Sequence, residues 1–361
     1  MQKLTKNRDS TGYSTAARGY IRGLVANGCD VATRHVHLSG SEIYEKFEQD
    51  YSDLKNVDVC IQHTLPSMFR KTKAKLDIGI FTWETTELPE EWVKSINKNV
   101  DAVFVPSVLD KCACSKLNKP VYVVGYPATI DKARINKNAR LNDPIVNEDT
   151  HIFYSITSES PRKNLTALIM CFLCAFREDD NCLLLLHIAS KDKDSARKEL
   201  VDNINGIKDG LGLDSYPKIA LSLNQLTDET INGIHLISDT YVSASHGESW
   251  NYPLFDAACL NNNVITTKCG GPIEYLDRDF DFVNGIYSPV YGMAKSSGGL
   301  YNAKSQWINF IANDLIDKMR NAYSGGKKKS SINNKLFSEY SEKNIGKTLL
   351  KNIKKILREK Q

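Results

Sequence analysis

A chain of 361 residues has room for about two globular domains of ordinary size. Hydrophobic residues make up 41% of the chain and charged residues 25%, which excludes a disordered or fibrous protein. Apolar runs such as 182–188 are far shorter than the roughly 20 residues that span a bilayer. A net charge of +4 is too small to predict a polyanionic partner by itself. The polar start MQKLTKNRDS lacks the apolar core of a signal peptide, so we expect a cytoplasmic protein.

Nine cysteines are scattered along the chain, and their spacing is not typical of a disulfide framework. Cys171 and Cys174 fall within the apolar helical run LIMCFLCAF, and Cys112 and Cys114 lie in a polar helical pattern without nearby histidines. We therefore expect free thiols with structural roles, as in proteins of a reducing compartment.

The first helical run of the chain ends at Gly28 and is preceded by Gly12, Tyr13 and Ser14. Small or flexible residues before a helix allow a ligand to approach the backbone closely, and Ser14 suits a helix cap. We expect Gly12 and Tyr13 to contribute to a ligand site, with a simple helix cap as the alternative.

Apolar segments then recur at regular intervals, and helical patterns separate most of them. Strands that alternate with helices predict a parallel sheet covered on both faces. Ligands of such sheets gather at the carboxyl ends of the strands, where His63 and Glu84 are the best polar candidates. The alternative is that His63 only caps a strand and that Glu84 is solvated. The expected strands are 30–37, 57–62, 76–81, 100–105 and 121–124.

A polar stretch without periodicity, 131–149, indicates a linker between two domains, with a long loop of the first domain as the alternative. A second series of alternating strands and helices follows it. The sequence therefore predicts an α/β protein with one domain at 1–140 and another at 150–325. The strands expected in the second domain are 151–157, 182–188, 218–223, 240–245 and 264–267.

The last segment, 330–361, has a basic helical pattern with an apolar stripe that includes Leu349, Ile353 and Ile356. Three interpretations remain open. The helix packs back on the first domain, or it makes a peripheral contact with an anionic membrane, or it binds a polyanion.

The stretch 243–274 reads as strand, loop, helix and strand, with Glu248 in the loop and Asp256 in the helix. Pro253 suits the start of a helix because it lacks an amide hydrogen, and the amides before it attract phosphate together with the helix dipole. Two acids flanking a phosphate site suit a ligand with hydroxyls at both ends, which is a nucleotide sugar. The alternative is an ordinary buried unit with two solvated acids.

Arg162 and Lys163 precede another expected helix, 165–176. Cations at a helix N-terminus oppose the helix dipole and destabilise the helix unless an anion lies between them and the amides. A diphosphate would supply that anion, whereas a solvated pair of cations is the alternative.

Glu248 and Asp256, with Pro253 between them, resemble the E-x7-E signature of retaining GT-B glycosyltransferases of the family 4 type. Gly270, Gly271 and Pro272, which follow the next strand, belong to the same resemblance. The resemblance covers most of the chain and is strongest over 162–274. It implies two Rossmann-like domains whose parallel sheets face each other across a cleft.

The resemblance also implies roles for single residues. Glu248 would hold the hydroxyls of the donor sugar, Asp256 the ribose, and Lys163 with Arg162 the diphosphate. Two departures are that the second acid is Asp, and that Ser249 and Asn251 replace the usual glycines. The implied donor-binding residues are Gly12, Tyr13, Arg162, Lys163, Glu248, Ser249, Trp250, Asn251 and Asp256, and the implied catalytic residues are Glu84, His63 and Glu248.

A glycosyltransferase of this type would move a hexose or pentose from a nucleoside-diphosphate sugar to a glycan or lipid-linked acceptor, with retention. The loop ESWNYP is also similar to viral and phage relatives, which leaves a modified base in DNA as an alternative acceptor. A non-catalytic module that binds nucleotide sugars or glycans is an alternative of another class. We expect no metal and no other cofactor. Asp277 and Asp279 have the spacing of metal-dependent transferases of a different fold, but we expect them to lie in a surface loop.

Overall fold

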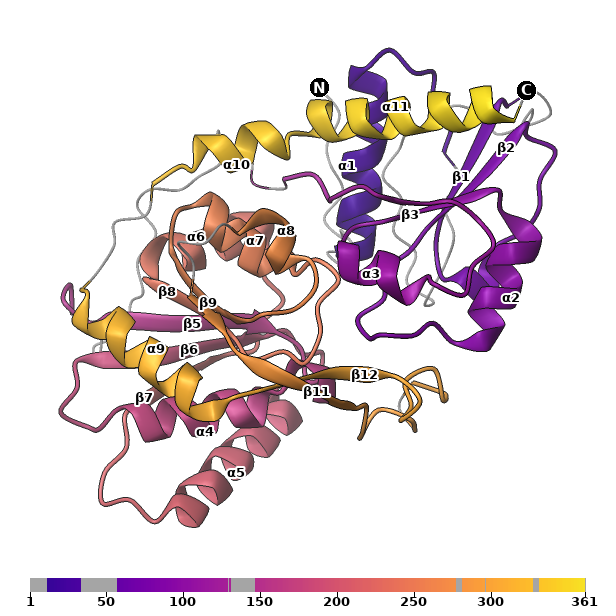
Figure 1. Cartoon of the computed structure of the whole chain (residues 1–361). Coiled ribbons are helices and arrows are strands. Elements are labelled where there is room, and N and C mark those ends of the chain that lie inside the picture. The colour runs from indigo at the N-terminus through magenta and orange to yellow at the C-terminus, as the bar shows by residue number, and fades with distance from the viewer. Residues whose placement is uncertain are drawn as a thin grey trace. The chain divides into compact units, whose positions relative to one another are not determined.

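The computed structural model describes residues 12–33, 57–128, 130, 147–276, 281–295, 297–326 and 331–360. The chain divides into two compact units, one of Met1–Thr129 with Phe337–Gln361 and one of Ile130–Leu336. Each unit has its own parallel sheet (Figure 1), so the expected α/β class with two parallel sheets is confirmed. Asp277 and Asp279 lie outside the described residues.

The sheet of the first unit has four parallel strands in the order β1-β2-β3-β4. β2 and β3 are buried at every position, as expected for parallel strands that are covered on both faces. Four of the expected strands, 57–62, 76–81, 100–105 and 121–124, are found, with ends shifted by one or two residues. Of the expected strand 30–37, residues 30–33 are not in a strand, and 34–37 lie outside the described residues. The elements are β1 (Val59–His63), η2 (Pro66–Met68), β2 (Leu76–Ile80), α2 (Glu90–Asn99), β3 (Ala102–Val105), α3 (Val108–Ala113) and β4 (Val121–Val123).

Two helices from opposite ends of the chain pack together in this unit, α1 (Gly12–Ala26) and α11 (Glu342–Glu359). They cross at two glycines: a Cβ built on Gly346 would lie 2.1 Å from the carbonyl oxygen of Gly23. Such close backbones leave no room for side chains at the crossing. Gly12, expected in a loop before the helix, is instead the first residue of α1. The expectation was wrong because Gly12 and Tyr13 have low helix propensity, which the packing of the helix overrides.

Ionic and apolar contacts hold α11 along its length. The guanidinium of Arg22 lies 2.6 Å from the Glu342 carboxylate, and the ammonium of Lys360 lies 2.9 Å from Asp101. Between these ends, the apolar stripe with Leu349 at its centre is buried. In this structure the stripe is therefore covered by the first unit. The short helix α10 (Asn334–Glu339) precedes α11.

The sheet of the second unit has six parallel strands in the order β10-β9-β8-β5-β6-β7. Helices α4, α5 and α9 cover one face, and α6, α7 and α8 cover the other (Figure 1). The strands are β5 (His151–Thr157), β6 (Cys182–Ile188), β7 (Lys218–Ser222), β8 (Thr240–Ser243), β9 (Asn263–Thr267) and β10 (Asp281–Val283). The helices are α4 (Leu165–Ala175), α5 (Lys193–Leu211), α6 (Asp228–Ile237), α7 (Tyr252–Cys259), α8 (Pro272–Tyr275) and α9 (Ala312–Ser324).

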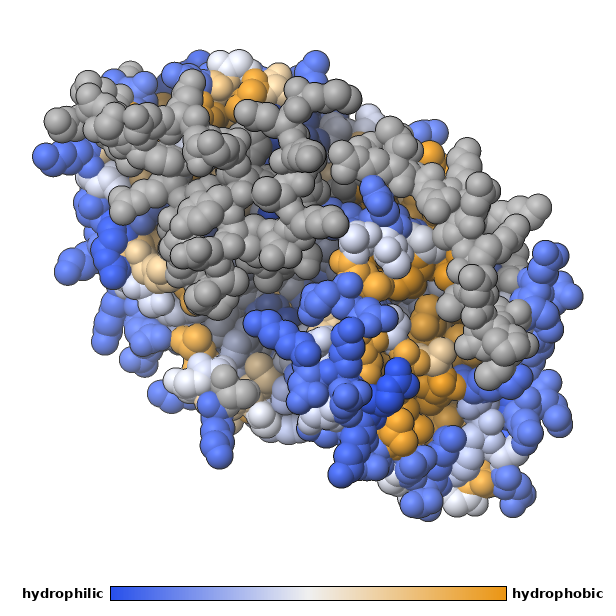
Figure 2. Space-filling view, turned by 180° about the vertical axis from the view of Figure 1, so that it is seen from behind, coloured by the Kyte–Doolittle hydropathy of each residue, from blue (hydrophilic) through white to orange (hydrophobic). Residues whose placement is uncertain are grey.

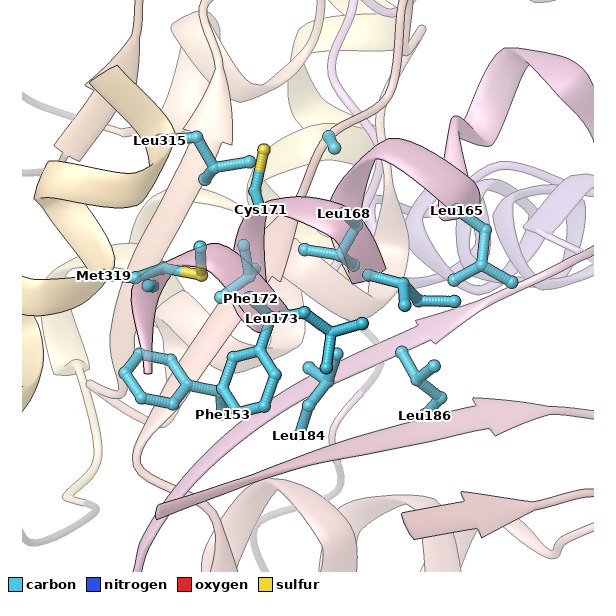
Figure 3. Close-up of a cluster of buried hydrophobic side chains, with 14 of the residues drawn as sticks. Phe153, Leu165, Leu168, Cys171, Phe172, Leu173, Leu184, Leu186, Leu315 and Met319 are labelled. Carbon is cyan, nitrogen blue, oxygen red and sulfur yellow. The ribbon is translucent and has the colours of Figure 1, made fainter. Parts of the chain in front are cut away.

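The main core of this unit lies between α4, α9 and the sheet (Figure 3). Phe172 of α4 packs on Phe153 of β5, with their ring centroids 5.7 Å apart. Leu315 and Met319 of α9 close the other side of α4 and are fully buried. Burying each such side chain contributes about 1.5 to 3 kcal/mol, so this core holds α4 against the sheet.

A two-stranded antiparallel ribbon, β11 (Gly285–Pro289) with β12 (Gln306–Phe310), was not expected from the sequence. Both strands are short, and β11 begins with Gly285 and ends with Pro289, which weakens its strand pattern. Tyr287 and Tyr291 of this region are more than half exposed.

On the face opposite that of Figure 1, hydrophilic residues alternate with smaller apolar patches over the described surface (Figure 2). None of the described helices is both long enough and apolar enough to cross a membrane. The nine cysteines are free thiols, and Cys171 of α4 is buried in the core.

Candidate functional site

Three loops of the second unit follow the carboxyl ends of neighbouring parallel strands. β5 leads through the turn η4 (Pro161–Lys163) into α4, and β8 leads through residues 244–251 into α7. β9 leads through Gly270 and Gly271 into α8. Because β9, β8 and β5 are adjacent in the sheet, these loops lie along one edge, which is where ligands of parallel sheets bind.

Glu248 lies between the two cations of the η4 turn. The Lys163 ammonium donates to one carboxylate oxygen of Glu248 at 2.6 Å, and the Arg162 guanidinium donates to the other at 3.1 Å. Arg162 also donates to the carbonyl oxygen of Gly247 at 2.6 Å. The anion that we inferred for these cations from the helix dipole is therefore supplied within the chain, by Glu248.

The environment of Glu248 keeps its carboxyl group ionised. Burial raises its pKa, but the charges of Lys163 and Arg162, with a hydrogen bond from Ser245, outweigh burial and lower the pKa to about 2. The side chain is almost fully buried, so water screens these charges weakly. The result is a compact group of three charges with a net charge of +1.

The loop that carries Glu248 is held by a second turn. The amide of Gly271 donates to the carbonyl oxygen of Glu248 at 3.0 Å. A Cβ on Gly271 would lie 2.3 Å from the carbonyl oxygen of Ser249, so the contact requires glycine. Both Gly271 and Ser249 are buried.

Asn251 ends the same loop in the left-handed conformation, with φ 66° and ψ 75°. Asn tolerates this conformation better than most residues, which accounts for its place where the resemblance leads us to expect glycine. Its side-chain oxygen accepts a hydrogen bond from the amide of Leu254 at 3.3 Å and caps α7. α7 begins at Tyr252, so Pro253 is its second residue rather than its first.

A narrow hollow lies beside this loop, between the ends of β5 and β8. Lys163, Glu248 and Asn251 line it, together with Ser245. Asp256 does not line this hollow, and lies in the second turn of α7, almost fully buried. The structure thus brings four of the predicted donor-binding residues, Arg162, Lys163, Glu248 and Asn251, to one place, and Asp256 to the helix behind them.

The side chain of Trp250 packs away from these charges. Its ring centroid lies 4.9 Å from that of Tyr275 and 5.3 Å from that of Phe255, and the residue is 2% exposed. The Tyr275 hydroxyl donates to the carbonyl oxygen of Trp250 at 2.9 Å. Trp250 therefore anchors the 244–251 loop by packing against Phe255 of α7 and Tyr275 of α8.

The β11–β12 ribbon reaches the same loop. His246 stacks on Trp307 of β12 with ring centroids 4.1 Å apart, and its Nδ1–H donates to the carbonyl oxygen of Ile308 at 2.9 Å. The amide of His246 donates to the carbonyl oxygen of Arg162 at 2.8 Å. Burial lowers the pKa of His246, so its imidazole is neutral near pH 7.

The candidates in the first unit form a group of their own. Tyr13 stacks on His63 with ring centroids 4.8 Å apart, and its hydroxyl accepts from the amide of Thr82 at 3.2 Å. Burial raises the pKa of Tyr13, and the charge of Glu84, which follows β2 in the same unit, adds to this effect. Burial lowers the pKa of His63 to about 4, and neither of its buried ring nitrogens has a hydrogen-bond partner among the described residues.

Two features of the site were not predicted from the sequence. Ser245, which donates to Glu248, has no distinctive sequence pattern, and Gly271 was noted only as part of a motif. Within the described ranges, we find no group of three or more His, Cys, Asp or Glu residues that is suited to a metal ion.

No protein-family profile and no curated protein sequence matches the chain. Solved structures do match it. A mutant of S. aureus TarM in complex with fondaparinux, alpha-GlcNAc-glycerol and UDP aligns with a TM-score of 0.51 at 12% identity, over 81% of this chain and 54% of TarM. Sucrose-phosphate synthase from Thermosynechococcus elongatus aligns with a TM-score of 0.53 at 13% identity, over 78% of this chain and 68% of the synthase.

A third solved structure, the E. coli trehalose-6-phosphate protein bound with UDP-2-fluoro glucose, aligns with a TM-score of 0.52 at 10% identity, over 83% of this chain and 74% of that one. The chain spans about half the length of TarM. Identities this low show the fold alone. Together with the two separate parallel sheets, these matches show that the chain has the GT-B fold.

Proposed function

We propose that this protein is a glycosyltransferase that takes its sugar from a nucleoside-diphosphate sugar. The observation that carries the proposal is the group of Arg162, Lys163 and Glu248 at the carboxyl edge of the second sheet. The cations suit a diphosphate, and the carboxylate suits sugar hydroxyls. Among nucleotide sugars, the matching solved structures support UDP-sugars as the first donors to test, because the TarM structure contains UDP and the E. coli structure contains UDP-2-fluoro glucose.

The charges of the site match those that develop as a glycosidic bond breaks. Negative charge grows on the leaving diphosphate, where Arg162 and Lys163 stabilise it, helped by the positive end of α7. Glu248 orients the sugar by accepting hydrogen bonds from its hydroxyls. Asp256 is the proposed partner of the ribose, with Ser249, Trp250 and Asn251 contributing backbone and cap contacts.

The finer features of the proposal rest on the sequence resemblance. They are the family 4 type, retention of configuration, independence of metal, transfer of a hexose or pentose, and a glycan or lipid-linked acceptor. Tyr13, His63 and Glu84 of the first unit are the proposed contacts of the transferred sugar or the acceptor, with Gly12 at the start of α1. The proposed location is the cytoplasm.

A panel of UDP-, GDP- and ADP-sugars tests the proposal through release of free nucleoside diphosphate. Lys163→Ala should weaken donor binding at least about tenfold, because it removes a charge-assisted contact of about 1.5 to 3 kcal/mol. Lys198→Ala, in the exposed part of α5, is the matched control and should change nothing.

The outcomes separate the alternatives. Thermal stabilisation by a sugar nucleotide without release of nucleoside diphosphate would make the protein a binding module. Transfer to a duplex with hydroxylated bases, weakened steeply by salt, would make DNA the acceptor. Unchanged donor affinity in Lys163→Ala would mean that the phosphate lies elsewhere.

A further inference from the structure

Glu248 occupies the place from which a diphosphate would have to contact the cations. Each of its carboxylate oxygens has its own cation, Lys163 at 2.6 Å and Arg162 at 3.1 Å. The side chains of Lys163 and Arg162 are 17% and 15% exposed, so both cations are largely enclosed around the carboxylate. A second anion therefore cannot reach them without coming next to Glu248.

Two anions in this space repel each other strongly. Two unit charges 4 Å apart interact by about 4 kcal/mol at the effective dielectric constant near a protein surface. Glu248 is ionised near pH 7 before a ligand binds, because the charges of Lys163 and Arg162 lower the pKa of its carboxyl group to about 2. A bare diphosphate that binds the cations must therefore displace Glu248 or remain beside an ionised carboxylate.

A nucleotide sugar differs from a bare diphosphate in one respect that matters here. Its sugar hydroxyls are hydrogen-bond donors, and a carboxylate accepts such bonds well. A carboxylate that loses Lys163 to the diphosphate can gain hydroxyl donors from the sugar on the same ligand. After transfer the sugar is gone, and the nucleoside diphosphate faces Glu248 with an additional ionisable oxygen.

We propose that Glu248 competes with the diphosphate for Arg162 and Lys163, and that it makes the site select nucleotide sugars over free nucleoside diphosphates. The inference rests on the proposed function and adds a specificity to it. The hydroxyls of the intact sugar are required to replace the hydrogen bonds that Glu248 loses when the diphosphate takes its cation. The same competition promotes release of the nucleoside diphosphate after transfer.

The test is the affinity of Glu248→Gln for UDP and for inorganic pyrophosphate, measured by titration calorimetry. Gln keeps the size of the side chain but removes its charge, so both affinities should rise at least tenfold, which is about 1.4 kcal/mol. Glu178→Gln is the charge-matched control, because Glu178 is exposed and lies before the amino end of β6, whereas the site lies at the carboxyl ends of the strands. Its affinities should equal those of the wild type.

A double variant separates competition from a general effect of charge. In the Lys163→Ala background, Glu248→Gln should raise the affinity for pyrophosphate by a smaller factor, because the contested cation is gone. If Glu248→Gln does not fold, the unaltered protein decides the question: UDP should bind at least tenfold more weakly than the UDP-sugar that it hydrolyses or transfers.

Equal pyrophosphate affinity in Glu248→Gln and the wild type would overturn the competition, even if the protein transfers sugars. Conversely, if no sugar nucleotide of the panel releases nucleoside diphosphate, the proposed function fails, whereas the pyrophosphate titration still measures the competition. The two failures are therefore distinguishable.

Discussion

The crossing of α1 and α11 makes a sharp prediction for Gly346→Ala. The added Cβ would lie 2.1 Å from the carbonyl oxygen and 2.2 Å from the carbonyl carbon of Gly23. These are backbone atoms, so no side chain can rotate out of the way. The two helices must separate by about 1 Å to reach ordinary contact distances.

Two opposing effects set the magnitude. Alanine favours a helix over glycine by about 1 kcal/mol, which stabilises α11. Overpacking a tight contact destabilises by about 1 to 3 kcal/mol, and separation of the helices also loosens the burial of Leu349 and Ile353. We expect the packing effect to dominate, with a net loss of about 1 to 2 kcal/mol in the free energy of unfolding.

Denaturant unfolding followed by circular dichroism measures this loss, and Gly206→Ala in α5 is the control. A Cβ on Gly206 would meet nothing within 4 Å, so this variant should gain about 0.5 to 1 kcal/mol from helix propensity alone. The reasoning is refuted if Gly346→Ala is as stable as the wild type or gains as much as Gly206→Ala.

Three further variants test the site and its support. Gly271→Ala places a Cβ 2.3 Å from the backbone of Ser249, so it should lower kcat/KM about tenfold or more and also destabilise the second unit by about 1 to 3 kcal/mol; unchanged kinetics would contradict the role of this turn. Asn262→Leu removes hydrogen bonds from the Asn262 amide to the His235 carbonyl oxygen at 2.6 Å and the Tyr154 hydroxyl at 2.8 Å, and should destabilise the second unit by about 2 to 3 kcal/mol in urea unfolding. A loss below about 0.5 kcal/mol would mean that this buried network is dispensable. His63→Phe tests burial of a neutral imidazole: its pKa is about 4 when folded and near 6.5 when unfolded, so the unfolded chain binds the proton first, and wild-type stability falls as the pH drops from about 6.5 to 4. The urea midpoint of His63→Phe should fall less between pH 7 and pH 5, and equal slopes would show that His63 is not buried as described.

Local pattern in the sequence was sufficient for most of the strands. Runs such as 182–188 are apolar at every position because both faces of a parallel strand are covered, so these strands are visible without tertiary information. The β11–β12 ribbon was missed because its strands are short, β11 begins with Gly and ends with Pro, and β12 depends on contacts with residues such as His246. The start of α1 was misplaced because Gly12 and Tyr13 are weak helix formers.

The sequence by itself determined the order of the elements, the α/β class and which residues at the strand ends could carry chemistry, because periodicity and residue type are local properties. Only the tertiary structure decided how those residues are paired. Lys163 and Glu248 are 85 residues apart, and their ion pair exists because β5 and β8 are neighbours in the sheet. Likewise, Gly23 and Gly346 are required only because α1 and α11, two helices from opposite ends of the chain, cross at these residues. Pairings of this kind depend on three-dimensional proximity, which no local pattern records.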